Sequence, residues 1–147
     1  MSARTARIVR VGLVILAVSG AVVGLWAGLA PRSFYDDFPG FGNPWVSPDG
    51  PFNEHLLRDF GAMQLGLVVL TVCALVWFTR PLVAATALAW LAASLPHLAY
   101  HVFNTDPYES KDQLGIVGGL AVGPVVAVVL LLAARGLGSS QPAVAPR

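Results

Sequence analysis

Two histidines four residues apart stand in an otherwise apolar run, and they are the residues best suited to chemistry. His97 and His101 belong to the segment "PHLAYH", with Ser94 shortly before it. A helix advances about 100° per residue, so these three side chains share one stripe roughly 60° wide. Imidazole binds metals and haem iron, and it exchanges hydrogen bonds and protons with small molecules. The spacing therefore predicts a polar helix face that could hold a ligand.

A second polar segment, "NEHLLRD", precedes another apolar run. It contains Glu54, His55, Arg58 and Asp59, which would occupy an arc of about 140° on a helix. Glu54–Arg58 and His55–Asp59 are each spaced to interact across one helical turn. We expect both segments to lie at the same membrane depth and to form one polar site together. Ionisable residues at that depth usually face the bundle interior and mark function.

The six residues leave several interpretations open. They could line a pocket for a lipid, a quinone or a partner protein, or they could only tie two helices together. In a metal site, His97 and His101 would share one ion, and Glu54, His55 or Asp59 would complete the coordination. Repeated Glu-x-x-His motifs, typical of carboxylate–histidine bundles, do not occur here. In a haem site, His55 would have to oppose His97 or His101.

The composition places the whole chain in a membrane. Of its 147 residues, 56% are hydrophobic and 12% are charged, whereas soluble domains are roughly 25% charged. The formal net charge is +1, and the basic residues form no patch along the sequence, so we expect no nucleic-acid partner. Cys73 is the single cysteine, which excludes an intrachain disulfide.

Four apolar runs are long enough to cross a bilayer, which takes about 20 residues. They cover residues 8–30, 56–78, 82–103 and 114–134. Backbone polar groups need internal partners in hydrocarbon, so each run should be a helix. We therefore predict an all-α, four-transmembrane-helix bundle over residues 1–135 and a disordered cytoplasmic tail over 136–147. The first run is too long for a signal peptide, and Pro31 follows its only cleavage-like site.

Charge predicts the direction of the bundle. One side of the four spans carries only arginines, at positions 4, 7, 10, 80, 135 and 147. All 8 acidic residues fall on the other side. The positive-inside rule then puts both termini in the cytoplasm of a multi-pass protein of the cell membrane. The aromatic-rich loop between the first two helices, residues 31–55, would form a structured cap on the outer side.

Two spans carry glycine at every fourth position, a pattern that lets helix backbones approach closely. The first row is Gly20, Gly24 and Gly28, and the second is Gly115, Gly119 and Gly123. The rows predict helix packing, either within one chain or against a second copy or another membrane protein. Separately, the turn "FTRPL" predicts that the second and third helices form an antiparallel hairpin.

Three segments carry a family resemblance: "FYDDFPG", "GPFNEHLLRDFGAMQLGL" and "PHLAYHVFN". They resemble a group of actinobacterial four-helix membrane proteins of unknown function, close in plan to the DoxX-like proteins. The resemblance covers about residues 30–105. It implies a four-helix bundle in the cytoplasmic membrane. Relatives of DoxX are linked to thiosulfate:quinone oxidoreductase and to redox-stress complexes, which favours quinone, but the resemblance assigns no catalytic residue.

We expect a binding or accessory subunit rather than an enzyme, because no nucleotide-binding, Cys-x-x-Cys or nucleophile motif is present. It would hold a lipid, a quinone or a partner protein at the outer polar site. One alternative is a membrane oxidoreductase or a metal or haem protein that uses His55, His97 and His101. Another is a small carrier that acts as a dimer, although the chain shows no internal repeat.

Overall fold

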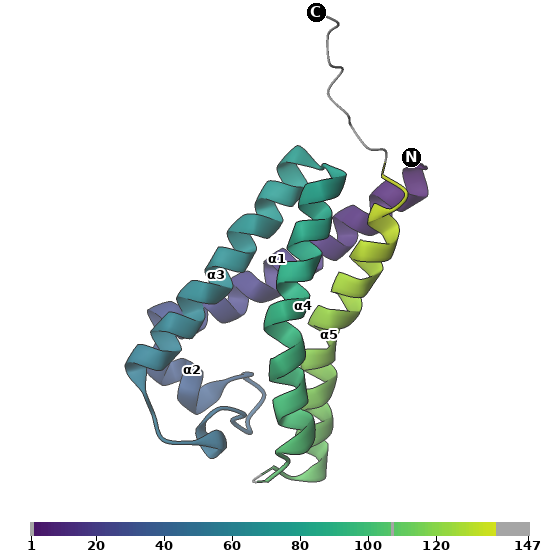
Figure 1. The fold of residues 1–147 in the computed structure, drawn as a ribbon. Helices are drawn as coiled ribbons and strands as arrows, with labels where there is room; N and C mark the ends of the chain where they lie inside the picture. Colours follow the sequence, from purple (N-terminus) through teal and green to yellow (C-terminus); the bar gives the residue numbers. More distant parts are fainter. Residues whose placement is uncertain (1, 107, 138–147) are drawn as a thin grey trace, which may run out of the picture.

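The computed structural model describes residues 2–106 and 108–137, and these residues form an all-helical fold (Figure 1). The described part of the chain contains five α-helices, one 3-10 helix and no strand. The elements are α1 (Ala3–Leu29), α2 (Pro31–Asp37), η1 (Ser47–Asp49), α3 (Glu54–Trp77), α4 (Arg80–Phe103) and α5 (Ser110–Ala134). The predicted four-helix bundle is therefore confirmed, with one short additional helix.

The ends of the long helices follow from local side chains. Ser2 caps α1, and Asn53 caps α3 by accepting a hydrogen bond from the Leu56 backbone at 3.1 Å. At its other end α3 stops at Phe78, which has a left-handed backbone with φ 46°. Thr79 then leads directly into α4, whose first turn contains Pro81. This is the tight turn that the sequence predicts.

Helices α1, α3, α4 and α5 are each long and apolar enough to cross a membrane, with mean hydropathies of 2.4, 2.0, 1.6 and 2.6 over their best windows. Many large apolar side chains point outward along their length. Examples are Val22, Val69, Val76, Val125 and Leu132, all more than half exposed. A soluble protein does not present apolar surface on this scale. These features define a multi-pass helical membrane protein.

The four long helices are arranged as two pairs, α1 with α3 and α4 with α5 (Figure 1). Helices α3 and α4 share the tight turn but diverge from it, so each contacts its other neighbour more extensively. This refines the hairpin expected from the sequence. The buried core extends from the middle of the bundle toward the end that carries the α3–α4 turn. Its members are Val9, Leu13, Leu16, Ala74, Val83, Ala87, Trp90, Ala127, Leu130, Ala134 and Leu137.

Glycines allow α1 and α3 to pack closely against each other. A Cβ atom on Gly61 of α3 would lie 2.5 Å from the Gly28 nitrogen and 2.8 Å from the Gly24 carbonyl oxygen. On the α1 side, a Cβ on Gly24 would lie 3.0 Å from Leu65. The first glycine row thus packs within the chain, against a partner glycine that the spacing rule does not name.

Trp90 ties the two pairs together. Its indole nitrogen donates a hydrogen bond to the Thr71 hydroxyl of α3 at 2.9 Å. The far edge of its ring fills the space beside Gly20, where a Cβ would lie 2.9 Å away. Trp90 and Thr71 are both buried. One side chain of α4 therefore contacts both α3 and α1.

The chain packs onto the core once more after α5, at Leu137. Leu137 is 4% exposed and belongs to the core, so the described domain extends past residue 135. The remainder of the predicted disordered tail, residues 138–147, lies outside the described residues.

Candidate functional site

A folded cap, residues 31–53, lies in the space where α3 and α4 have separated (Figure 1). It contains α2 and η1. The sequence predicts a structured cap here but not the helix α2. Signals for that helix exist: Pro31 is at its first position, and Arg32–Asp36 and Ser33–Asp37 are spaced four residues apart.

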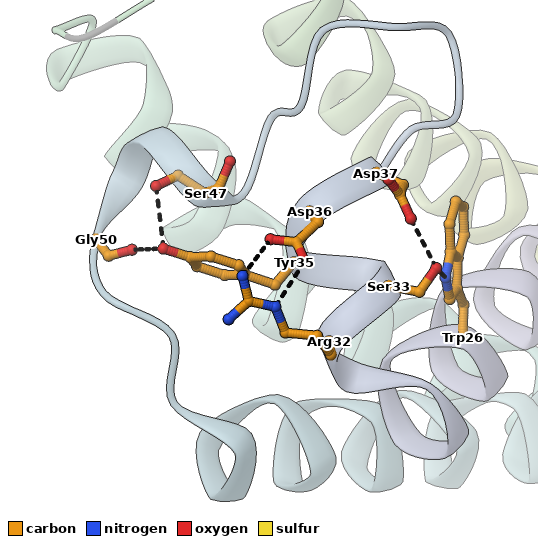
Figure 2. Close-up of polar contacts among 8 residues, drawn as sticks. All are labelled: Trp26, Arg32, Ser33, Tyr35, Asp36, Asp37, Ser47 and Gly50. Atoms are coloured by element: carbon orange, nitrogen blue, oxygen red, sulfur yellow. Dashed lines mark hydrogen bonds and ion pairs between the residues drawn. The ribbon is translucent and has the colours of Figure 1, made fainter.

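Polar contacts fix the cap, as Figure 2 shows. Arg32 forms a two-pronged pair with Asp36, with nitrogen–oxygen distances of 2.6 and 3.0 Å. The Tyr35 hydroxyl reaches across the loop and donates to the Gly50 carbonyl at 2.6 Å. The Trp26 indole of α1 donates to Ser33 at 3.2 Å. These contacts hold both halves of the cap to each other and to the end of α1.

Aromatic packing carries the cap from one helix pair to the other. The Phe38 ring lies 5.8 Å from Trp26 and 6.1 Å from Trp45. Trp45 in turn covers α5, where a Cβ on Gly115 would lie 2.8 Å from its ring. Gly115 therefore makes room for the Trp45 ring of the cap. The glycine row predicts packing against another helix and not this contact. Gly119 lies at the edge of the same ring, and Gly123 faces Ser94 of α4.

A second group of residues, the histidine cluster, lies where α4 meets the cap. We define it as His97, Tyr100, His101, Tyr108 and Asp49. The His97 and His101 rings are 5.1 Å apart. The His101 ring lies 5.2 Å from Tyr100 and 6.2 Å from Tyr108. The Tyr100 hydroxyl is 3.5 Å from an Asp49 oxygen in η1. The cluster thus joins α4, the α4–α5 connection and the cap.

The two imidazoles of this cluster are not used by the fold. Within the described residues neither His97 nor His101 makes a hydrogen bond, and Nδ1 of His101 is buried without a partner. The His97 side chain is exposed, and its ring packs edge-on at 6.4 Å against Phe60 of α3. Both rings therefore carry nitrogen atoms that the described part of the chain leaves without hydrogen bonds.

Tyr108 connects the cluster to the cap. Its hydroxyl donates to the Trp45 carbonyl at 2.8 Å. Burial raises the pKa of Tyr108 to about 12, and the nearby Asp49 carboxylate adds to the increase. The phenol is therefore a neutral donor at physiological pH.

The polar segment at the start of α3 forms separate surface pairs. His55 pairs with Asp59 at 3.3 Å, and the His55 side chain is 87% exposed. Glu54 pairs with Arg58 at 2.8 Å. Arg58 also donates to the Gly28 carbonyl at 2.6 Å, which satisfies a free carbonyl at the end of α1. No hydrogen bond or ion pair in the described chain joins these four residues to His97 or His101.

A shallow cavity of about 140 Å³ lies between the cap and the first turns of α3. Its lining is mostly apolar, and Asp49, Tyr35 and Asn53 supply polar side chains. Asp49 is thus shared between this cavity and the histidine cluster. Pockets that enclose a whole drug-sized ligand measure roughly 300–1,000 Å³, so this cavity has room only for part of a molecule.

The described part of the chain does not gather the donors that a metal or haem site would need. Within residues 2–106 and 108–137, no group of three or more His, Cys, Asp or Glu side chains could hold a metal ion. For haem, His55 would have to face His97 or His101, but it pairs with Asp59 on the surface of α3. The six residues grouped in the sequence therefore divide into a histidine pair and a surface ion-pair group.

Sequence reasoning identified the two histidines but missed Tyr100, Tyr108 and Asp49. Tyr100 stands inside "PHLAYH", and its aromatic–polar character was an available signal. Tyr108 and Asp49 lie in loops, and no spacing rule relates a loop residue to a distant helix.

Comparisons of the chain with protein-family models, with curated proteins and with solved structures give no match. The DoxX-like resemblance therefore stays a prediction that rests on its three segments. Function is therefore inferred from the residues of the site itself.

Proposed function

We propose that this protein is a membrane binding or accessory subunit that holds the polar head of an amphipathic small molecule at the histidine cluster. The ligand carries hydrogen-bond acceptors, which are the carbonyl oxygens of a quinone or the ester and phosphate oxygens of a lipid. Its apolar part lies in the bilayer against the outward-facing side chains of α3 and α4. The site is formed by α4, the cap and the α4–α5 connection.

The observation that supports this function is the pair of imidazoles without hydrogen bonds. Polar groups inside a membrane protein are usually paired because an unpaired group is costly in a low-dielectric environment. Nδ1 of His101 is buried without a partner, and the His97 side chain is exposed beside it. A ligand acceptor would pair with these groups.

The head-sized cavity beside the cluster supports an amphipathic ligand. The space of about 140 Å³ suits a head group, and Asp49 reaches both the cavity and Tyr100 of the cluster. Exposed apolar side chains such as Val69 and Leu95 on the adjoining helices offer a surface for a hydrocarbon tail. The DoxX-like resemblance favours the quinone.

We further propose that the protein resides in the cell membrane, with its arginine-bearing end in the cytoplasm and the cap outside. This follows from the distribution of charge along the chain. In that orientation, the ligand reaches the site from the outer leaflet.

Calorimetric titration of the purified full-length protein tests the proposal in two arms. One arm uses a short-chain benzoquinone and the other uses a short-chain phosphatidylcholine. We expect saturable binding in one arm, weakened roughly 30-fold by His97→Leu/His101→Leu, because two hydrogen bonds of about 1 kcal/mol each are lost.

His55→Leu is the matched control, because it removes the same side chain from the exposed surface of α3. It should leave the affinity unchanged. Equal weakening by His55→Leu and by the double variant would contradict the proposed site. Absence of binding in both arms would also contradict it, and the cap would then be examined as a surface for a membrane protein partner or a second copy.

A further inference from the structure

The opposite end of the bundle carries the protein's least compensated charge. The N-terminus of α1, the α3–α4 turn and the C-terminus of α5 lie at this end (Figure 1). Five exposed arginines are found there, namely Arg4, Arg7, Arg10, Arg80 and Arg135. No acidic residue of the chain occurs in these segments. We call these five residues the arginine end.

Basic residues at the two ends of the bundle differ in their partners. At the cap end, Arg32 pairs with Asp36, Arg58 with Glu54, and Lys111 with Glu109. At the arginine end, no ion pair with a carboxylate is formed in the part of the chain that the structure describes. Like charges gathered around one end repel one another, so an external anion would stabilise this arrangement.

Two of these arginines are placed beside the membrane-facing surface. The guanidinium of Arg10 lies over the Phe78 ring, 4.2 Å from its centroid. Arg80 stands two residues after Phe78 in the sequence, so both arginines lie close to the α3–α4 turn. Next to them, Trp77 is 65% exposed and Val76 is 70% exposed. Tryptophan at a helix end is typical of the headgroup level, and the apolar surface can contact acyl chains.

We propose that the arginine end binds the phosphate headgroup of an anionic phospholipid at the α3–α4 turn, with Arg10 and Arg80 as its principal contacts. Guanidinium groups bind phosphate oxygens through paired, charge-assisted hydrogen bonds. Exposed Trp77 and Val76 favour a lipid over a water-soluble phosphate because they supply a surface for its chains. This site is independent of the histidine cluster and lies at the other end of the bundle.

Native mass spectrometry of the full chain in detergent tests the proposal with phosphatidylglycerol and phosphatidylcholine as probes. We expect preferential retention of phosphatidylglycerol. Arg10→Gln/Arg80→Gln should weaken it about 25-fold, from roughly fivefold for each basic residue near an anionic headgroup. Arg32→Gln/Lys111→Gln removes the same charge at the cap end and should change retention little.

The variant Arg10→Lys/Arg80→Lys keeps both positive charges, so it distinguishes an effect of lost charge from an effect of misfolding. Circular dichroism checks the helix content of every variant. The lysine variant should keep most of the preference for phosphatidylglycerol. The proposal is overturned if phosphatidylcholine is retained equally, or if the two glutamine double variants lose phosphatidylglycerol to the same extent. Retention of inorganic phosphate at the same site, without lipid, would also overturn it.

Discussion

At Gly61 the backbones of α1 and α3 come so close that no side chain fits. A Cβ atom there would lie 2.5 Å from the Gly28 nitrogen and 2.8 Å from both the Gly24 oxygen and the Gly28 Cα. These are backbone atoms, so the helices themselves must separate. We predict that Gly61→Ala lowers the free energy of unfolding by about 2 kcal/mol, the usual cost of overpacking. Unfolding in detergent, followed by circular dichroism, measures it.

Gly66 provides the control on the same helix. A Cβ on Gly66 meets nothing within 4 Å. Because alanine favours a helix over glycine by up to about 1 kcal/mol, Gly66→Ala should leave stability unchanged or slightly higher. Equal losses in the two variants would show that α1 and α3 do not pack through Gly61.

Tyr108 gives a prediction for alkaline pH. Burial raises its pKa from 10.0 to about 12, so the folded protein favours the protonated phenol that donates to Trp45. Its stabilisation is full below pH 10 and is lost as the pH rises through about 12. The tyrosinate absorbance of the protein minus that of Tyr108→Phe should therefore show a step with a midpoint near 12. A step at the ordinary pKa of 10.0 would show that Tyr108 is not buried by the cap.

Single residues were predictable where they contrast with their surroundings. His97 and His101 stand out because imidazoles are unusual in an apolar helix, and the i,i+4 pairs of "NEHLLRD" form as expected. The polar contact expected between "NEHLLRD" and "PHLAYH" does not form in the described residues. Phe60, rather than Glu54 or Asp59, contacts His97, because the side of α3 that faces α4 is set by the packing of α3 on α1.

Among the helices, the hydrogen bond from Trp90 to Thr71 is the clearest link between the two pairs. Thr71→Val removes the acceptor and leaves the buried indole nitrogen without a partner. We predict a loss of about 1 kcal/mol in the free energy of unfolding, within the range for hydrogen bonds between membrane helices. Thermal unfolding in detergent measures the change.

Thr86→Val is the matched control for that variant. Thr86 is also buried, but its hydroxyl donates at 2.8 Å to the Leu82 carbonyl of its own helix and makes only a long contact, 3.5 Å, with the Leu70 carbonyl of α3. The change should therefore cost clearly less than Thr71→Val. If the two variants were equally destabilised, the Trp90–Thr71 bond would contribute nothing specific to the contact between α3 and α4.

The four long helices were predictable because apolar length is a strong signal, and α1 and α5 begin before their apolar runs at capped or polar residues. Helix α2 was not predicted, since seven residues carry too little periodicity to distinguish a helix from a structured loop. Pairing was also beyond the sequence. Glycine rows predict close approach, but Gly20 and Gly24 meet Trp90 and Leu65, whereas Gly115 meets a loop tryptophan.

For the whole molecule, the separation of charge predicts its orientation. All five arginines of the arginine end lie opposite the cap, so we expect both termini in the cytoplasm. In a Cys73→Ala background, Ser2→Cys should be protected from a membrane-impermeant thiol reagent in intact cells, and Asn43→Cys should react. The reverse labelling pattern would place the cap inside the cell.

The two ends of the bundle also differ in how closely the helices pack. The buried core gathers toward the arginine end, while the other end opens around the cap. The stabilising core and the proposed ligand site are thereby separated, because helices held at one end can diverge at the other without losing their main contacts. The residues of the histidine cluster are not members of this buried core.

The most direct test of the histidine cluster is the small-molecule content of the purified protein. Organic extracts of the protein, of His97→Leu/His101→Leu and of His55→Leu would be compared by mass spectrometry at equal protein amounts. We predict one amphipathic compound in near-stoichiometric amount in the protein and in His55→Leu, strongly depleted in the double variant. The same content in all three samples would contradict a ligand site at His97 and His101.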